Sequence, residues 1–491
     1  MTTCYELKNN RELCWDMYIA DKIDNVSLDI HKPIRKNVVL ECDREWEIGG
    51  VNYIGVVKVG DTYRLYYRGR GKDFFKTYKN NFCIAQSSDG KTFTRSYLGQ
   101  HAFEGSTDNN LFHSEDRCID NFSVFADTNP NCPADAKFKA LSAADEWQDG
   151  CRVPGLLYYK SSDGTNFVKV GKLPVPGVFD SYNVVLWDDA DQEYKMYIRN
   201  FHDKNGETPQ RCPQNDEDLK TVYRDIRLTR SVDFVSWTTP EEIVFDDGNR
   251  LIELYTNQIV KYKRTENFYI GFPSRYNNRP QPCGNYKYLP DWNGKRAEWN
   301  NSGSRIGTVF VDTGIITSRD GFHFHRWNGA YMTPGPQRPD NWYYEDCYLG
   351  YDMITTDSDY EPGTPELSIY RPEGYHVANT RIVRYTVRMD GFFSWHSDFS
   401  GESVTTVPLT FDGDSLEINY ATSGLGSIRV IICDQTGAAI EGYDSDLIWG
   451  DMIDRNIDFD KPLSDLKGKP VRIRFEMKDA DIYSFKFNGL S

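Results

Sequence analysis

The stretch "SSDGKTF" (Ser87–Phe93) decides the fold, because the chain repeats it with small changes. "SSDGTNF" (Ser161–Phe167), "SVDFVSW" (Ser231–Trp237) and "SRDGFHF" (Ser318–Phe324) follow at intervals of 74, 70 and 87 residues. In such a turn the Ser and Asp side chains bond nearby backbone amides, and Gly supplies a positive φ. A unit of about four strands that returns at this period is typical of a β-propeller blade. We therefore interpret the four turns as structural parts of a repeat, not as a catalytic motif.

Five hairpins accompany these turns, built from short runs of Val, Ile, Tyr and Phe between Gly, Asp, Asn and Pro. In Val51–Gly71 an apolar strand, a Gly60-Asp61 turn and an alternating strand follow one another. Related patterns lie at 119–143, 181–201, 254–275 and 347–376, and each of the first four hairpins precedes a Ser-x-Asp turn. The sequence therefore predicts an all-β chain whose larger part is a five-bladed β-propeller.

The pattern changes after Tyr385, where cleanly alternating strands are joined by short Gly or Asp turns. About eight strands in roughly 105 residues match a β-sandwich. We expect a lead-in segment at 1–36, a propeller with the catalytic site at 37–382 and a β-sandwich at 383–491 that buttresses the propeller.

Composition excludes several kinds of partner. The net charge is −16 and no basic run occurs, so neither nucleic acid nor an anionic membrane is expected to bind. No apolar stretch approaches the roughly 18 residues that cross a bilayer. The first residues, "MTTCYELKNNRELCW", lack the features of a secretory signal, which fits either a cytoplasmic protein or one whose signal was removed. The eleven cysteines are scattered without a CxxC pair, and no metal or cofactor is predicted.

Several segments resemble one known superfamily. "VSLDIHKPIRKNVVLECDREWE", "NFSVFADTNP", "FDSYNVVLWD", "ELYTNQIVKY", "TSRDGFHFHRW" and "RYTVRMDGFFS" make residues 26–487 similar to the five-bladed propeller glycoside hydrolases, and most to a bacterial group like family 32 with a C-terminal β-sandwich. The resemblance implies this fold and carbohydrate cleavage by carboxylic acids. The invertase-type "NDPNG", "RDP" and "EC" motifs are missing, so the residues of those enzymes are not carried over.

Candidate catalytic residues follow from propeller geometry, because carboxylates that precede the inner strands converge on one funnel. Glycoside cleavage needs an acid for the leaving oxygen and a base or nucleophile for the anomeric carbon. Asp180 precedes an inner strand in a polar setting and is expected to be the base or nucleophile. Glu253 lies among apolar neighbours, which suits a general acid. Glu47 ranks third, and each of the three has the alternative of capping a turn or pairing with Arg.

Further residues near the same strand ends are expected to bind substrate. The aromatic ones offer stacking walls for sugar rings, although such residues also fill blade interfaces. Arg275 is the arginine most suited to a sugar hydroxyl or sugar acid, although an arginine there also suits clamping of a neighbouring blade. The expected substrate-binding set is Trp46, Asp120, Tyr182, Tyr255, Arg275, Asp312, Trp342 and Glu345.

The sequence therefore predicts a glycoside hydrolase that acts on an oligosaccharide or glycoside, with no prediction of its oligomeric state. Long loops at 205–223 and 279–305 are expected to wall the funnel into a pocket, which favours exo-action on a terminal sugar. Two alternatives stay open. A phosphorylase of the same fold would need a cationic cluster, to which Arg275 with Lys261 or Lys263 would contribute. A non-catalytic carbohydrate-binding propeller would bind sugar without turnover.

Overall fold

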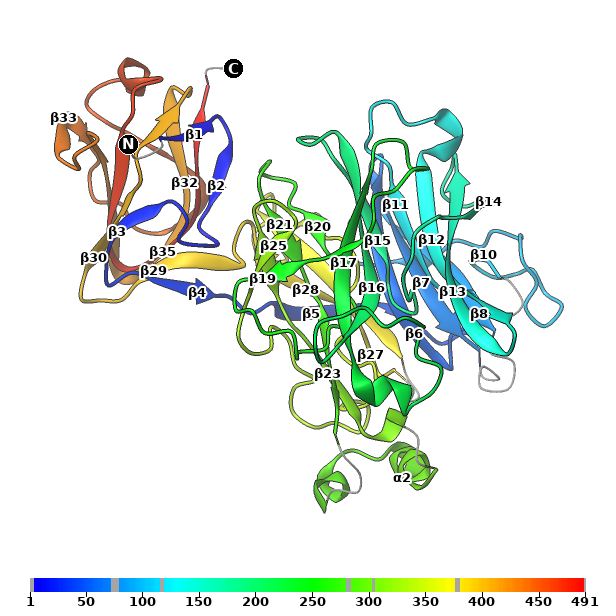
Figure 1. Cartoon of the computed structure of the whole chain (residues 1–491). Helices are drawn as coiled ribbons and strands as arrows, with labels where there is room; N and C mark the ends of the chain where they lie inside the picture. Colours follow the sequence, from blue (N-terminus) through cyan, green and yellow to red (C-terminus); the bar gives the residue numbers. More distant parts are fainter. Residues whose placement is uncertain are drawn as a thin grey trace. The chain divides into compact units, whose positions relative to one another are not determined.

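The computed structural model describes residues 4–71, 79–114, 119–279, 284–302, 305–375 and 380–489 (Figure 1). Its regular structure is mostly β-strand. The chain divides into two compact units. One comprises Pro33–Lys261 and Asn267–Thr386, and the other comprises Met1–Lys32, Tyr262–Glu266 and Val387–Ser491. The segment at 1–36 therefore contributes to both units.

The larger unit is a five-bladed β-propeller, as the repeats predict. Each blade is one mostly antiparallel sheet, and the inner strands of blades I to V are β6 (Gly50–Val59), β11 (Ile119–Ala126), β15 (Val184–Asp188), β20 (Val260–Lys261) and β26 (Ile354–Asp357). Blade I holds β6 (Gly50–Val59), β7 (Thr62–Arg70), β8 (Asn80–Ser87), β9 (Thr94–Arg95) and β10 (Leu111–His113). Blade II holds β11 (Ile119–Ala126), β12 (Phe138–Gln148), β13 (Cys151–Ser161) and β14 (Val168–Lys172). Blade III holds β15 (Val184–Asp188), β16 (Glu193–Asp203), β17 (Val222–Ser231) and β18 (Glu241–Glu242).

The last two blades recruit strands from elsewhere in the chain. Blade IV holds β20 (Val260–Lys261), β21 (Tyr269–Gly271), β24 (Ile316–Ser318) and β25 (His323–Arg326), and β19 (Val244–Phe245) runs parallel to β25. Blade V holds β26 (Ile354–Asp357), β27 (Pro365–Glu373), β28 (Arg381–Arg388) and β5 (Ile34–Glu41). A separate ribbon, β22 (Ser274–Asn278) with β23 (Val309–Thr313), is inserted in blade IV between β21 and β24. The loop that joins its two strands carries α2 (Lys295–Asn301).

The ring of blades closes through contacts between first and last. Strand β5, from the start of the propeller, completes blade V by pairing with β28. The inner strands of neighbouring blades also contact each other, β6 with β11, β11 with β15, β15 with β20, and β26 with β6. Gln258 of blade IV donates to the Leu349 carbonyl ahead of blade V at 2.9 Å. The starts of the inner strands are thereby brought to one end of a closed ring.

The Ser-x-Asp turns have the hydrogen bonds that their sequence predicts. In the first turn the Gly90 amide donates to the Ser87 hydroxyl at 2.9 Å. The Lys91 and Thr92 amides donate to the Asp89 carboxylate at 2.8 and 3.2 Å. The three later turns repeat the pattern. Since these side chains satisfy local backbone amides, the turns are structural.

The turns also join neighbouring blades. A tyrosine hydroxyl of the preceding blade donates to the turn glycine carbonyl in three cases, Tyr370 to Gly90, Tyr66 to Gly164 and Tyr197 to Gly321, at 2.6, 2.9 and 2.8 Å.

The third turn in the chain, at 231–237, replaces this hydrogen bond with aromatic packing. Its fourth residue is Phe234 instead of glycine, and it keeps a positive φ of 63°. By strand register, Leu141 of blade II stands where blade I has Tyr66. The Phe234 ring packs instead on Tyr158 and Tyr194, with centroids at 4.6 and 5.0 Å. The exchange of Gly and Tyr for Phe and Leu therefore preserves contact between the blades.

We expect Gly90→Ala to destabilise the propeller by about 2–4 kcal/mol, measured by denaturant unfolding. Gly90 has φ of 72°, and an added Cβ would lie 2.6 Å from Ile354 and 2.9 Å from Thr356. Gly60→Ala is the matched control, because Gly60 has φ of 59° but an added Cβ meets nothing within 4 Å. The control loses only the backbone contribution, about 1–2 kcal/mol. Equal losses in the two variants would contradict the packing argument.

The smaller unit consists of long, paired strands around one apolar core. Strands β32 and β35 form its centre and pair along most of their length. The core includes Trp395, Phe475 and Phe485, all fully buried. Its strands are β1 (Tyr5–Lys8), β2 (Arg11–Leu13), β3 (Ala20–Asp24), β4 (Ser27–Ile30), β29 (Phe393–Ser397), β30 (Glu402–Thr406), β31 (Leu409–Phe411), β32 (Ser415–Cys433), β33 (Ala439–Asp444), β34 (Asp451–Ile457) and β35 (Arg472–Asn488).

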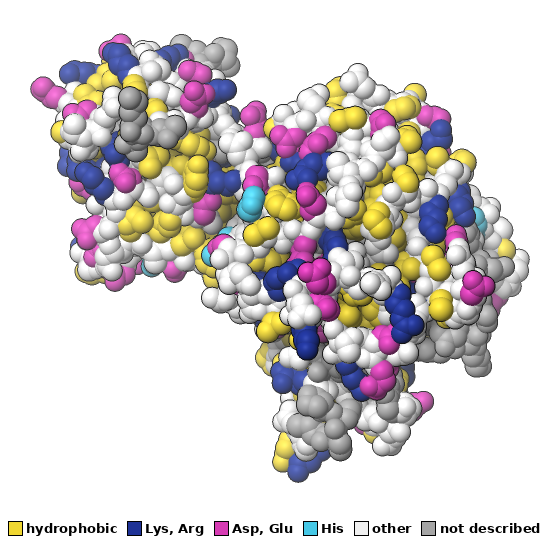
Figure 2. All heavy atoms as spheres, viewed as in Figure 1, with side chains coloured by type: hydrophobic (Ala, Val, Ile, Leu, Met, Phe, Trp, Pro, Cys, Tyr) yellow, Lys and Arg dark blue, Asp and Glu magenta, His cyan; other side chains and the backbone are white. Residues whose placement is uncertain are grey.

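The remaining elements are short, and the surface is mixed in charge. Single 3-10 turns lie at Ala134–Ala136, Asp218–Thr221, Gly284–Tyr288, Trp292–Gly294, Arg305–Gly307 and Leu463–Leu466. Acidic and basic side chains are interspersed on the face that Figure 2 shows. Among the described residues, no helix has the length and apolar character that a membrane span requires.

Candidate functional site

The inner-strand ends of the propeller have an unusual backbone. Tyr53, Asn121, Gln258 and Asp352 all have positive φ, between 40° and 65°. They lie in or just before the inner strands of blades I, II, IV and V. The pairings of β6 and β11 also contain irregularities at these points. Such backbone re-aims side chains, is sparsely populated and is concentrated at functional sites. Together these features mark this end of the ring as the candidate site.

Tyrosine rings from four blades meet there. The Tyr53 ring centroid lies 5.6 Å from that of Tyr182 and 5.8 Å from that of Tyr348. Tyr348 in turn stacks on Tyr255 at 5.7 Å. The Arg68 guanidinium lies over the Tyr53 ring, 4.3 Å from its centroid. Tyr182 and Tyr255, expected from the sequence, are therefore brought together, while Tyr53 and Tyr348 were missed because only the fold places them beside the others.

Arg68 connects residues of three blades beside this group of tyrosines. Its side chain is 2% exposed and donates to Asp120, to Asn121 at 2.8 Å and to Tyr375 at 3.0 Å. It also lies 3.6 Å from Glu345. Two of the expected substrate-binding carboxylates thus share one buried guanidinium. Asp120 keeps 34% of its side chain exposed, whereas Glu345 keeps 5%, so only Asp120 is open to a ligand.

Asp180 and Glu253 occupy equivalent places in blades III and IV. Arg199 lies 3.8 Å from the Asp180 carboxylate, and Arg224 donates to Glu253. Both guanidinium groups face the Tyr255 ring, at 5.5 and 5.4 Å from its centroid. The Asp180 side chain is 33% exposed and that of Glu253 is 19% exposed. The two carboxylates are therefore held by guanidinium groups that face the same tyrosine, and both reach solvent.

A second acidic group beside Asp180 was missed by the sequence analysis. Arg152 of β13 donates to Asp145 of β12 at 2.7 Å. Burial raises the pKa of Asp145, and the negative charge of Asp180 adds to the increase while Arg152 opposes it. Both residues belong to the long β12–β13 hairpin. Nothing in their local sequence marks them, because only the tertiary structure brings this hairpin to blade III.

Arg275 and Asp312 form a pair of their own on the β22–β23 ribbon. The guanidinium donates from Nε and Nη2 to the two carboxylate oxygens at 2.6 and 2.7 Å. Both side chains are partly exposed. Trp342, also expected to contact substrate, is half-buried, and its indole N–H donates to the Gly335 carbonyl at 2.8 Å.

Glu47 and Trp46 are buried inside the propeller, away from the residues described so far. The Glu47 side chain is fully buried, accepts from Arg95 at 2.6 and 3.1 Å, and accepts from the Tyr67 hydroxyl at 2.6 Å. Trp46 donates to the Asn110 side chain at 2.8 Å within the core shared by blades I and V. A substrate would have to displace these contacts to reach either residue. Their surroundings favour a structural role.

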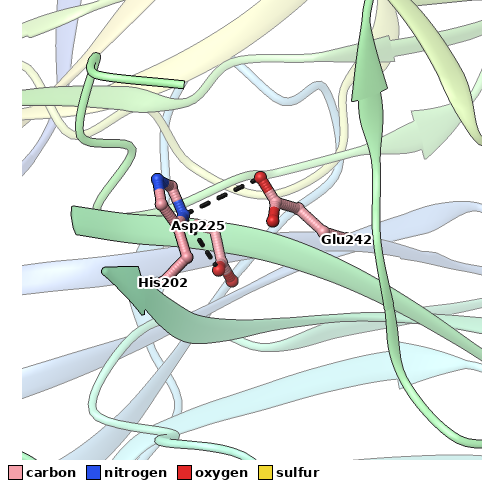
Figure 3. A group of neighbouring side chains, drawn as sticks. All are labelled: His202, Asp225 and Glu242. Atoms are coloured by element: carbon pink, nitrogen blue, oxygen red, sulfur yellow. Dashed lines mark hydrogen bonds and ion pairs between the residues drawn. The ribbon is translucent and has the colours of Figure 1, made fainter. Parts of the chain in front are cut away.

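A possible metal cluster is explained by charge pairing instead (Figure 3). His202 of β16, Asp225 of β17 and Glu242 of β18 point toward one another. The His202 Nδ1 lies 3.2 Å from Asp225 and 3.7 Å from Glu242, and Nε2 lies 3.0 Å from the Arg250 carbonyl. Both ring nitrogens face oxygen acceptors, which only the doubly protonated imidazolium satisfies.

The carboxylates of that cluster are already neutralised. Arg227 donates to both oxygens of Asp225 at 3.0 and 2.9 Å, and Arg250 donates to Glu242. Burial opposes the charge on His202, but the hydrogen bond to Asp225 and the charge of Glu242 outweigh it, so the pKa of His202 is raised. A metal ion would have to replace these protons and arginines.

We expect His202→Gln to cost more stability at pH 5.5 than at pH 9. Because the pKa of His202 is higher in the folded protein than in the unfolded chain, protonation of His202 stabilises the fold. This stabilisation is complete below the unfolded-state pKa of about 6.5, and it is lost as the pH rises through the folded-state pKa. The measurement is the difference in melting temperature between wild type and variant at the two pH values. Zinc or EDTA should not shift the melting temperature. A zinc-dependent increase that the variant loses would establish a metal site instead.

Comparisons with known proteins give structural matches only. No family model matches the chain, and no curated protein matches it in sequence. A solved glycoside hydrolase is 12% identical, with a TM-score of 0.40, over 74% of this chain and 93% of that one. An N-acetylgalactosamine deacetylase from F. plautii, in complex with blood group B trisaccharide, is 11% identical with a TM-score of 0.42 over 92% and 95%. A family 43 arabinoxylan arabinofuranohydrolase from Bacillus subtilis, in complex with cellotetraose, is 10% identical with a TM-score of 0.35 over 91% and 97%.

The blades, the closure by β5 and the converging inner strands define the class. The protein is a five-bladed β-propeller protein, and its candidate site at one end of the ring brings together carboxylates, arginines and buried tyrosines.

Proposed function

We propose that the protein is a glycoside hydrolase that cleaves a terminal sugar at the inner-strand ends of the propeller. One observation carries the proposal. Asp180 and Glu253, from neighbouring blades, are both partly exposed and both lie beside the guanidinium groups that face Tyr255. Two carboxyl groups that both reach solvent are what glycoside cleavage requires.

The residues have separate roles in this proposal. Asp180 acts as base or nucleophile at the anomeric carbon, and Glu253 donates the proton to the leaving oxygen. Asp120, held by Arg68, binds a sugar hydroxyl. The pair of Asp145 and Arg152 sets the charge around Asp180, since both lie within its electrostatic reach. The tyrosines exclude water, which strengthens every charged contact inside the site.

A loop beside Asp180 supports exo-action. In the segment 205–223, the Gln214 side chain accepts from the Arg152 amide at 2.7 Å and donates to the Arg152 carbonyl at 3.2 Å. The loop is thereby attached to the β12–β13 hairpin beside the candidate nucleophile, where it suits the role of a wall on one side of the site. Parts of the second expected wall, 280–283 and 303–304, lie outside the described residues.

Hydrolysis fits this site better than phosphorolysis. Each of the arginines Arg68, Arg199, Arg224 and Arg275 has a carboxylate beside it. Lys261 pairs with Asp188, which ends β15, whereas Asp180 precedes that strand. To bind phosphate, these arginines and Lys261 would therefore first have to give up their carboxylate partners.

The test is product release from a panel of aryl glycosides and of plant and microbial polysaccharides, with and without phosphate. Phosphate-independent release of single sugars supports the proposal. Turnover only with phosphate establishes a phosphorylase, and early products of intermediate length contradict exo-action. Sugar binding with no turnover on any member of the panel establishes a non-catalytic carbohydrate-binding protein.

A further inference from the structure

A separate small pocket lies at the ribbon that carries the Arg275–Asp312 pair. Its volume is about 150 Å³, and almost all of its lining is apolar. The walls come from the first part of the loop between β22 and β23, from β23 itself and from the segment ahead of blade V. The lining residues are Arg279, Asn285, Tyr286, Leu289, Phe310 and Trp342.

Three aromatic rings form the pocket's main surfaces. Tyr286 stacks on Phe310 with centroids 6.1 Å apart and planes 22° apart. Trp342 meets Phe310 edge-on, with centroids at 6.3 Å and planes at 62°. The Trp342 indole N–H is already bonded to the Gly335 carbonyl, so the ring offers its π-face and edges to a ligand. The pocket thus presents aromatic surface with few polar groups.

A buried arginine, Arg296, links the segments that form the walls of the pocket. Arg296 of α2 is 2% exposed and donates to the carbonyls of Pro290 at 2.8 Å and of Trp342. Its guanidinium also lies 5.6 Å from the Phe310 centroid. One side chain therefore ties together the loop, the strand and the segment that form the walls. A preformed cavity costs a ligand little ordering energy.

The strand pattern links this pocket to the carboxylate site. Phe310 and Asp312 lie on the same face of β23, because alternate residues of a strand share a face. Their cross-strand partners are Asn277 and Arg275. Trp342 stands three residues before Glu345, which lies 3.6 Å from Arg68. The pocket is therefore connected to the carboxylate site through β23 and through the stretch from Trp342 to Glu345.

We propose that this pocket binds a planar aromatic group of the substrate, carried as the aglycone beyond the scissile bond. An apolar cavity of about 150 Å³ accepts a benzene-sized ring. A sugar ring would leave hydroxyl groups without partners against the apolar lining, which disfavours it. An aromatic ring also gains contacts with Phe310 and Trp342 that an alkyl group of the same size lacks. The aglycone assignment rests on the proposed glycosidase function, whereas aromatic binding by the pocket does not.

The direct test uses phenol, with cyclohexanol as its non-aromatic counterpart, in calorimetric titration of the full chain. We expect wild type to bind phenol more tightly than cyclohexanol. Phe310→Ala and Trp342→Ala should each weaken phenol binding about tenfold. Tyr97→Ala is the matched control, because Tyr97 is exposed on the outer side of blade I and lines no part of the pocket. Phe310→Leu keeps apolar volume and serves if the alanine variants fail to fold.

The outcomes separate this inference from the proposed function. Equal binding of phenol and cyclohexanol, or phenol binding that survives in folded Phe310 and Trp342 variants, overturns the aromatic pocket. A phenyl glycoside cleaved no better than the methyl glycoside of the same sugar overturns the aglycone assignment and leaves the glycosidase intact. Specific phenol binding without cleavage of any glycoside supports the pocket and contradicts the glycosidase.

Discussion

The Asp180→Asn variant should turn over substrate about a thousandfold more slowly than wild type, with its melting temperature within a few degrees. Removal of a reacting carboxylate takes away a contribution of about 10²–10⁴ from proton transfer alone. Asparagine keeps the size and hydrogen-bonding reach of the side chain, and the aspartate is 33% exposed, so the fold should tolerate the change. The measurement is kcat/KM on the best substrate of the panel, beside thermal unfolding.

Two further variants sharpen this result. Glu253→Gln should lose turnover to a similar extent, because the amide cannot donate the acid's proton. Asp189→Asn is the matched control, since Asp189 is exposed in the hairpin turn of the same blade and should leave kcat/KM unchanged. Full activity in well-folded Asp180→Asn and Glu253→Gln would move the chemistry to Asp120 and contradict the roles proposed above.

The Glu47→Ala variant should lose about 3–5 kcal/mol of unfolding free energy, because it leaves Arg95 in a buried place without its main partner. The Glu47 carboxylate is 0% exposed and bonded to Arg95 and Tyr67. Asp43→Ala is the matched control, since Asp43 binds the same guanidinium at 3.0 Å but is 62% exposed. An exposed ion pair contributes at most about 1 kcal/mol.

Activity separates the structural role of Glu47 from a catalytic one. Glu47→Gln retains a polar side chain beside Arg95, and we expect its folded fraction to keep the turnover of wild type. Denaturant unfolding and kcat/KM would be measured on the same preparation. A stable Glu47→Gln protein with lost turnover would return Glu47 to the catalytic set.

The repeated turns could be interpreted from sequence because their interactions are local. Ser87, Asp89 and Gly90 satisfy one another within a few residues, so the same letters give the same geometry wherever they occur. Regular placement of acids before inner strands likewise pointed to Asp180, Glu253 and Asp120. Propeller topology then brings such positions to one end of the ring, whatever their distance in the chain.

The same rule failed to distinguish Glu47, because exposure depends on contacts distant in sequence. Arg95, on the outer strand β9, reaches back to Glu47 and takes it out of reach of solvent. Asp145 shows the reverse case. It lies in the middle of a long hairpin with no sequence signal, and the fold places it within the field of Asp180.

The sequence by itself determined the all-β class, the five blades and the strand ends on which a site can form, since these depend on turn chemistry and strand periodicity. The tertiary structure alone decided which carboxylate each arginine pairs with and which tyrosines meet around Tyr53. The physical reason is that charge pairing and burial are properties of neighbours in space. Those neighbours stand on different strands or loops and mostly on different blades, so no local stretch of sequence contains both partners.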